Sequence, residues 1–386
     1  MTILLQLALI IAASKLAGQL SIWARQPAVL GELLVGVVLG PAVLGWVANT
    51  EIIHVFSEIG VILLMFLAGN ETNLQLLRQN SRSSLAVATG GILFPLVFGT
   101  LSGMAAGLST NIALFIGIVL SATSVSITVQ TLKEINQLQA RESSAILGAA
   151  VLDDVLVVIL LAFAASMFGG SSQTISAVIG EKLIFFVSIL LFAWFAIPLI
   201  MRLAGRMPVT QPVVSAAVAL SFLAAWYGEK LGVAGIIGAF IAGLSVGQTP
   251  FRQQIETTVE PIAYSIFVPV FFTAIGLNVS FSGLGAYGWF ILLFTVLAVL
   301  TKWVGAALGA RLTGFNWLSS LCVGSGMISR GEVALIIAAS GNESQLISHA
   351  LYTPLILIII LSTLAAPPAV KQMFRRKEAA LDKEPI

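Results

Sequence analysis

Acidic and hydroxyl side chains stand together in two stretches that are otherwise apolar. Asp153 and Asp154 are adjacent in GAAVLDDVLVVILL, and the run 121–126, SATSVS, contains Thr123 and Ser124. Carboxylate, hydroxyl and main-chain carbonyl oxygens are the ligands that hard cations prefer, and a carboxylate also accepts a proton. The four side chains therefore predict a site at which sodium and protons compete, with Asp153 and Asp154 as ligands of the transported metal ion.

The composition places this chemistry in a membrane. Of the 386 residues, 58% are hydrophobic and 9% are charged, whereas a soluble domain has about 45–50% apolar and about 25% charged residues. The chain could not cover a water-facing surface, so a soluble enzyme is excluded. No phosphate-binding GxxxxGK[ST] motif and no large basic block occur, which argues against nucleotide-driven pumping and nucleic-acid binding. We expect no cofactor, and we expect the transported ions to be sodium or lithium, and protons.

Three further charges lie in apolar surroundings: Lys302 in LAVLTKWVGAALG, and Arg330 and Glu332 in GSGMISRGE. A charge at the bilayer centre costs about 2.5–3.5 kcal/mol, so with the aspartate pair the five would cost on the order of 12–17 kcal/mol unpaired. They must pair or face water. Three acids and two bases leave one negative charge, which a proton or a monovalent cation can neutralise. Lys302 is assigned to the ion site, and Arg330 and Glu332 either take part or hold a broken helix together.

The pattern of apolar segments predicts an all-α integral membrane protein with about thirteen transmembrane helices. A span needs about 20 mostly apolar residues, and Pro, Gly and charged clusters mark the ends. The predicted spans are 2–24, 27–41, 51–69, 83–107, 111–133, 141–168, 175–203, 210–229, 231–248, 253–276, 286–311, 316–340 and 346–370.

The chain also repeats itself. Four glycines, Gly31, Gly36, Gly40 and Gly69, recur 207 positions later as Gly238, Gly243, Gly247 and Gly276. The shift displaces the spans by seven, an odd number, so the two halves would cross the membrane in opposite directions. Inverted repeats with interrupted helices are typical of secondary transporters. The single transmembrane unit 1–386 would divide into a first repeat 1–168, a linker helix 175–203, a second repeat 210–370 and a cytoplasmic tail 371–386.

The basic residues predict the orientation of the chain. With thirteen spans and a cytoplasmic C-terminus, fourteen of the nineteen Lys and Arg residues fall on the cytoplasmic side and only Lys182 and Lys230 on the other. This asymmetry follows the positive-inside rule and places the N-terminus outside.

The combination of FSEIGVILLMFLAGNE at 56–71, LDD at 152–154, Lys302 in its apolar span and GMISRGEVALIIA at 326–338 resembles bacterial sodium/proton antiporters. Within these, it is similar to the second monovalent cation:proton antiporter family and its electrogenic NapA type, which exchanges two protons for one sodium. The resemblance implies a homodimer in the bacterial inner membrane, with a dimerisation domain and a mobile core domain that contains two crossed, discontinuous helices.

The resemblance also implies roles for the site residues. Asp154 would be the essential carrier of sodium and protons, with Asp153 as its helper. Lys302 would pair with Asp154 when sodium is absent, and Thr123 would lie at the crossover of the broken helices. The hypothesis is electrogenic sodium/proton antiport by alternating access.

Other functions fit parts of the pattern. Potassium/proton antiport and a sodium-coupled solute symporter use similar sites, and a channel would also need polar groups in the membrane. An intramembrane aspartyl protease needs two aspartates on different helices sharing a proton, whereas Asp153 and Asp154 lie on one.

Overall fold

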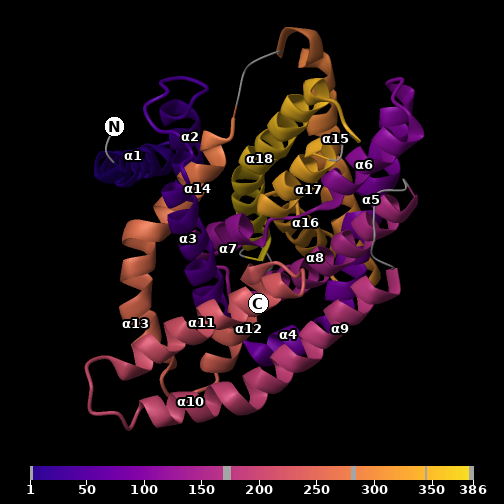
Figure 1. The fold of residues 1–386 in the computed structure, drawn as a ribbon. Helices are drawn as coiled ribbons and strands as arrows, with labels where there is room; N and C mark the ends of the chain where they lie inside the picture. Colours follow the sequence, from indigo (N-terminus) through magenta and orange to yellow (C-terminus); the bar gives the residue numbers. More distant parts are fainter. Residues whose placement is uncertain (1–2, 168–174, 280–283, 344–345, 382–386) are drawn as a thin grey trace.

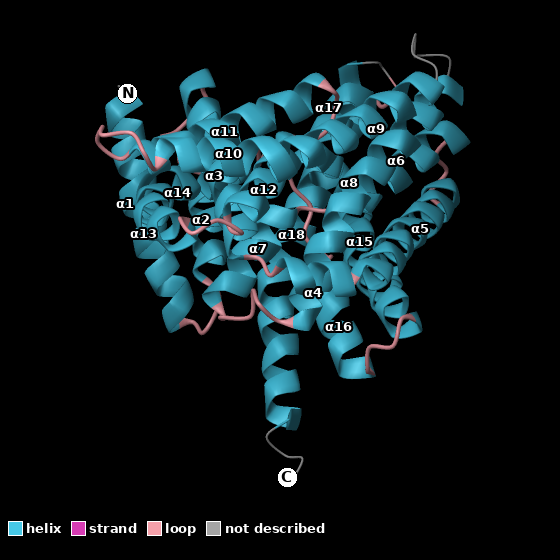
Figure 2. Cartoon of the chain, turned by 90° about the horizontal axis from the view of Figure 1, so that it is seen from below, coloured by secondary structure: helices cyan, strands magenta, loops and turns pink. Residues whose placement is uncertain are grey.

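A computed structural model describes residues 3–167, 175–279, 284–343 and 346–381, and these residues form helices and loops with no strand among them (Figure 2). Within these ranges, nine helices are long and apolar enough to cross a membrane, and two shorter apolar helices accompany them. Helices satisfy every backbone polar group internally, which lipid requires. The chain is a multi-pass membrane protein, and helical segments lie in each of the thirteen predicted spans.

One group of helices, which we call the site bundle, packs around the stretches that carry the predicted ion ligands (Figure 1). The long helices α5 and α15 pack along each other through glycines: a side chain at Gly90 or at Gly305 would meet the other residue's carbonyl oxygen within 2.3 Å. The members are α5 (Ser81–Ala105), α6 (Thr110–Ser121), α7 (Val125–Glu134), α8 (Arg141–Met167), α15 (Leu284–Leu312), α16 (Trp317–Gly326), α17 (Glu332–Glu343) and α18 (His349–Leu381).

A second group, the flanking bundle, packs beside the first (Figure 1). Its helices also approach each other closely at glycines, as small residues allow in membrane proteins. The members are α1 (Ile3–Trp23), α2 (Ala28–Leu39), α3 (Glu51–Glu71), α11 (Pro212–Lys230), α12 (Gly235–Val246), α13 (Arg252–Ile262), η2 (Ala263–Phe267) and α14 (Val268–Leu277). The π-helical turn η2 joins α13 and α14 into one span.

A long connecting helix links the two bundles, at the place predicted for the linker. It consists of α9 (Ile175–Leu191), the π-helical turn η1 (Phe192–Ala196) and α10 (Ile197–Ala204). Figure 1 shows it running along the lower edge of the molecule, with α9 beside the site bundle and α10 near α11 of the flanking bundle. A short helix that was not predicted, α4 (Leu74–Gln79), connects α3 to α5.

Two of the predicted spans are broken where the sequence places polar runs. α6 ends at Ser121 and α7 begins at Val125, and α16 ends at Gly326 before α17 begins at Glu332. Ala122 and Ser124 have extended backbone angles. The prediction of two discontinuous helices is confirmed.

The last helix departs from the prediction. The span expected to end at 370 continues as α18 to Leu381, so most of the predicted tail 371–386 is helical and residues 382–386 lie outside the described part. Met373 and Phe374 are buried, and the Lys377 ammonium lies 2.8 Å from the Glu142 carboxylate on α8. These contacts stabilise the helix beyond Pro367 and Pro368.

Candidate ion-binding site

The two helix breaks contact each other in the middle of the site bundle. The Ser124 amide donates to the Ser329 carbonyl at 2.8 Å, and the Ser329 hydroxyl donates to the Ser124 carbonyl at 2.7 Å. Each broken segment thus supplies partners for backbone groups that the other segment's helix leaves free. Gly331 allows the approach, since a Cβ there would lie 2.6 Å from the Ser124 hydroxyl oxygen.

Asp153 on α8 points to this crossing and makes the central ion pair. Both of its carboxylate oxygens lie 3.2 Å from the Lys302 ammonium nitrogen, which comes from α15. The Thr123 hydroxyl donates to the same carboxylate at 2.5 Å. Asp153 and Lys302 are both 0% exposed, so the pair is removed from water. Loss of either charge would leave the other buried without a partner of opposite charge, which is strongly destabilising.

Lys302 also donates to the carbonyl oxygen of Ser121, the last residue of α6. The C-terminal end of a helix carries a partial negative charge from its free carbonyls. Lys302 is therefore held by the full negative charge of Asp153 and by the partial negative charge at the C-terminal end of α6. A main-chain carbonyl leaves no mark in the sequence, so this contact was not predicted.

Arg330 is buried beside the same helix end but contacts main-chain carbonyls. Its guanidinium donates to Leu120 at 3.0 and 2.7 Å, to Ala298 at 2.7 Å and to Ile328 at 3.0 Å. It is 0% exposed. The side chain thus ties α6 and α15 to the break before α17. Whether Arg330 also takes part in ion binding stays a prediction.

The remaining predicted site residues lie around this centre. Asp154 is 3% exposed and Ser124 is 7% exposed, and Ser124 is part of the crossing itself. The structure pairs Lys302 with Asp153, whereas the resemblance implied Asp154. The side chain of Glu332 lies outside the described part of the structure, so its predicted pairing with Arg330 is not tested.

The described part of the structure contains a cavity of about 440 Å³. It lies between the bundles, because α3, α12 and α14 line one wall and α17 lines the other through Val333, Leu335 and Ile336. Val333 is close in sequence to the break that contains Arg330. The exposed residues His54, Glu58 and Glu229 line the mouth of the cavity.

A buried carboxylate and ammonium at the meeting point of two broken membrane helices define a membrane ion transporter. Residues 7–376 match the family described as "Sodium/hydrogen exchanger, transmembrane". The chain belongs to this family, which is one of transporters and not of enzymes.

Curated relatives and a solved structure agree with this assignment. The chain is 51% identical over 376 residues to the Na+/H+-K+ antiporter GerN of Bacillus cereus, covering 97% of each protein. It is 42% identical over 373 residues to the Na+/H+ antiporter of Enterococcus hirae, covering 96% of this chain and 97% of the relative. The sodium proton antiporter MjNhaP1 from Methanocaldococcus jannaschii has the same fold, with a TM-score of 0.70 at 18% identity over 97% of both chains.

Proposed function

We propose that the chain is a sodium/proton antiporter that works by alternating access, with Asp153 and Asp154 as the groups for which sodium and protons compete. The observation that carries this proposal is the buried Asp153–Lys302 pair at the crossing of two broken helices, in a member of the sodium/hydrogen exchanger family.

Competition follows from the charges at the crossing. Lys302 and a sodium ion are both cations and would use the same Asp153 oxygens, so sodium binding requires the ammonium to leave or to lose its proton. Thr123, Ser124 and Asp154 supply further oxygens near the vacated position, in line with the oxygen preference of hard cations. Returning protons restore the pair and release sodium. Asp154 is the carrier that exchanges its proton with the cavity, and Asp153 with Lys302 senses which ion is bound.

Charge counting in this cycle supports electrogenic exchange. When Lys302 is deprotonated rather than displaced, one proton leaves it and one leaves Asp154 for each sodium that binds, so two protons are exchanged for one sodium. The membrane potential then contributes about 2.3 kcal/mol per 100 mV for each net charge moved. This stoichiometry is that of the NapA type in the second monovalent cation:proton antiporter family, to which we assign the chain.

Glycine contacts support the proposed inverted repeats. A Cβ at Gly31 would lie 2.2 Å from the Ala17 carbonyl, and one at Gly238 would lie 2.1 Å from the Ala224 carbonyl. Both residues of the second contact follow those of the first by 207 positions, the shift of the repeat. α1 and α2 therefore pack as α11 and α12 do. Thirteen crossings, with repeats 1–168 and 210–370 about the linker 175–203, account for this relation.

We also propose an orientation, from the distribution of Lys and Arg residues, and a dimeric assembly. The protein lies in the bacterial inner membrane. The C-terminus and most of the Lys and Arg residues outside the spans are on the cytoplasmic side, and the N-terminus is on the outside. The flanking bundle forms the dimerisation domain of a homodimer, and the site bundle is the mobile core domain. Leu4 and Trp23 of α1 are 77% and 73% exposed and provide apolar surface for this contact or for lipid.

Proteoliposomes with an imposed pH gradient test the proposal. Addition of sodium should collapse the gradient with the parent protein, and Asp154→Asn should abolish this response because a neutral amide cannot exchange a proton. Asp153→Asn should reduce it strongly, since Lys302 loses its partner. Glu51→Gln, at the exposed start of α3, is the matched control and should transport normally. Normal transport by Asp154→Asn would reject the assignment.

Two alternatives give different results in the same assay. The Bacillus cereus relative is named a Na+/H+-K+ antiporter, and a potassium/proton antiporter would collapse the gradient with potassium in place of sodium. A sodium-coupled symporter would take up sodium only with an organic solute present and would leave the pH gradient unchanged.

A further inference from the structure

The two bundles are separated at one end of the molecule and joined at the other. The cavity mouth includes Glu58 on α3, and α3 ends 13 residues later at Glu71. At 1.5 Å per residue this places the two positions about 20 Å apart along the helix. The contacts between the bundles concentrate around Glu71, where the half-helix α7 of the site bundle packs against α2 and α3.

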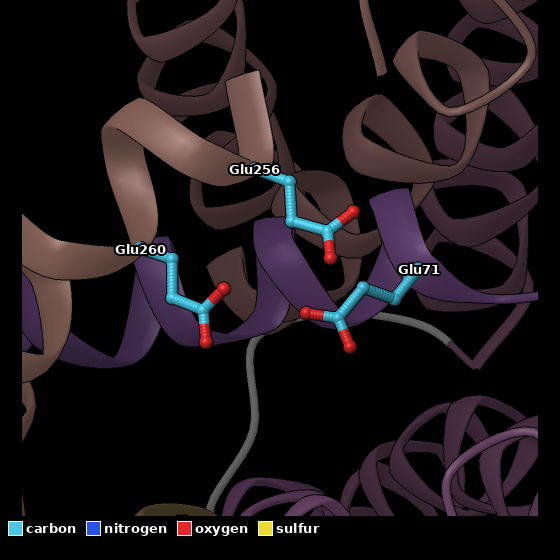
Figure 3. Close-up of side chains that lie close together, drawn as sticks. All are labelled: Glu71, Glu256 and Glu260. Atoms are coloured by element: carbon cyan, nitrogen blue, oxygen red, sulfur yellow. The ribbon is translucent and has the colours of Figure 1, made fainter. Parts of the chain in front are cut away.

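Lys133, in the last turn of α7, contacts two acids of the flanking bundle. Its ammonium hydrogen-bonds the Glu71 carboxylate of α3 and lies 3.1 Å from the Glu260 carboxylate of α13. It also sits 4.9 Å from the centre of the Tyr264 ring. Figure 3 shows Glu71, Glu256 and Glu260 converging from the two helices, and their carboxylates lie within 4.8 Å of one another. Three close carboxylates repel, so Lys133 is attracted to them strongly.

Glu134, the next residue, reaches a different element. Its two carboxylate oxygens accept hydrogen bonds from the Ala28 amide at 2.6 Å and the Val29 amide at 3.2 Å. These amides are the first of α2, whose N-terminal end carries free N–H groups and a partial positive charge. Gln130 of α7 donates to the same carboxylate at 2.9 Å, which fixes its direction.

We infer that Lys133 and Glu134, with their partners on α2, α3 and α13, form a clasp that holds the two bundles together at one face while the cavity separates them at the other. We name this set of contacts the α7 clasp. The inference rests on the proposed alternating access. It names the contacts that must break when the ion site becomes accessible from the face at which the clasp lies. α7 carries the crossing at one end and the clasp at the other, so a movement of the crossing displaces both charges together.

The matched control is an ion pair that does not join the bundles. The Lys377 ammonium lies 2.8 Å from Glu142, between α18 and α8, and its side chain is 22% exposed, against 21% for Lys133. Lys377→Gln and Glu142→Gln therefore remove the same charges in similar surroundings without touching the clasp.

Thiol labelling reports which face is open. Leu335 on α17 lines the cavity, and the chain's single cysteine, Cys322, is buried. In a Cys322→Ala background, Leu335→Cys should react with a membrane-impermeant maleimide added from the cavity side. Lys133→Gln and Glu134→Gln should each slow this reaction by up to about tenfold, because the loss of one charge-assisted hydrogen bond shifts the equilibrium between the open and the closed cavity by about that factor. The control substitutions should leave the rate unchanged.

The exchange pair Lys133→Glu with Glu71→Lys tests the same contact with the charges reversed. Labelling of this double variant should be faster than that of the single clasp variants, because opposite charges again face each other between α7 and α3. Equal rates in the parent and both single clasp variants would overturn the inference, as would equal slowing by Lys377→Gln. Labelling does not depend on which ions are exchanged, so failure of sodium/proton antiport in proteoliposomes would be seen separately.

Discussion

The two fully buried cations differ in what holds them. Lys302 pairs with a carboxylate and one helix end, whereas the Arg330 guanidinium donates to main-chain carbonyls of three segments. A single ammonium can leave its partner by rotation of a flexible stem, but a guanidinium with several fixed carbonyl partners is held in place. The difference supports the proposal that Lys302 takes part in transport and that Arg330 supports the helix breaks.

Arg330→Gln should therefore lower stability more than it changes ion preference. The shorter amide cannot reach Leu120, Ile328 and Ala298 together, and buried carbonyls without donors cost about 1–3 kcal/mol each. We expect a fall of about 3 kcal/mol in the free energy of unfolding, measured as a lower Tm in detergent. Arg202→Gln is the control, because Arg202 is exposed and donates within its own helix. An equal Tm for both variants would contradict this role.

At the scale of elements, glycines set the distance between helices of the flanking bundle. A Cβ at Gly243 on α12 would lie 2.0 Å from the Phe66 carbonyl on α3, and one at Gly36 on α2 would lie 2.0 Å from the Thr273 carbonyl on α14. Backbone atoms cannot move aside as a flexible side chain can. A side chain at either glycine would therefore force the two helices apart. This close packing supports the proposal that the flanking bundle is the rigid partner of a mobile site bundle.

Gly243→Ala should destabilise the protein although alanine favours helices. The methyl group would push α12 from α3, and overpacking of this kind typically costs about 1–3 kcal/mol. Gly288→Ala on α15 has open space around the new methyl and should be neutral or stabilising by up to about 1 kcal/mol. The Tm values of the two variants, measured side by side, check this, and a Tm for Gly243→Ala at or above the parent's would refute it.

For the whole molecule, the exposed apolar side chains identify the surface that lipid must cover. Leu190 and Trp194, on the connecting helix, are 56% and 77% exposed. Water would be a poor solvent for this surface. The connecting helix thus faces lipid while it joins the two bundles.

Leu190→Arg should reduce the amount of protein in the membrane fraction. A charge in the middle of this span costs about 2.5–3.5 kcal/mol on insertion. Gln253→Arg introduces the same side chain at an exposed position in the first turn of α13 and should have no effect. Immunoblots of membrane fractions compare the two, and equal amounts would show that Leu190 does not face lipid.

Much of this architecture could be predicted because the membrane restricts the choices. The polar runs around Thr123 and Arg330 indicated broken helices, since free backbone groups in lipid need partners. The fully buried charges Asp153 and Lys302 had to be paired on energetic grounds. Which aspartate faces Lys302 depends on the rotation of α8 against α15, and adjacent residues on a helix give no preference.

The clasp left no such signal in the sequence. Lys133 is an ordinary basic residue in the last turn of a helix, where the helix dipole alone would favour it, and Glu134 looks like a solvated helix end. Their partners lie on α3 and α2, more than 60 positions away. Likewise, Pro367 and Pro368 suggested the end of a span, but the buried Phe374 and the contact of Lys377 with Glu142 extend the helix.

The crossing of α6–α7 with α16–α17 has a consequence for how such a protein diversifies. The partial charges of the half-helix ends belong to the main chain, and the substitution of a single side chain does not remove them. Selectivity therefore resides in a few side chains placed on a polar frame that all variants share. New ion preferences could arise in a lineage by one or two replacements around the frame, with the rest of the bundle left intact.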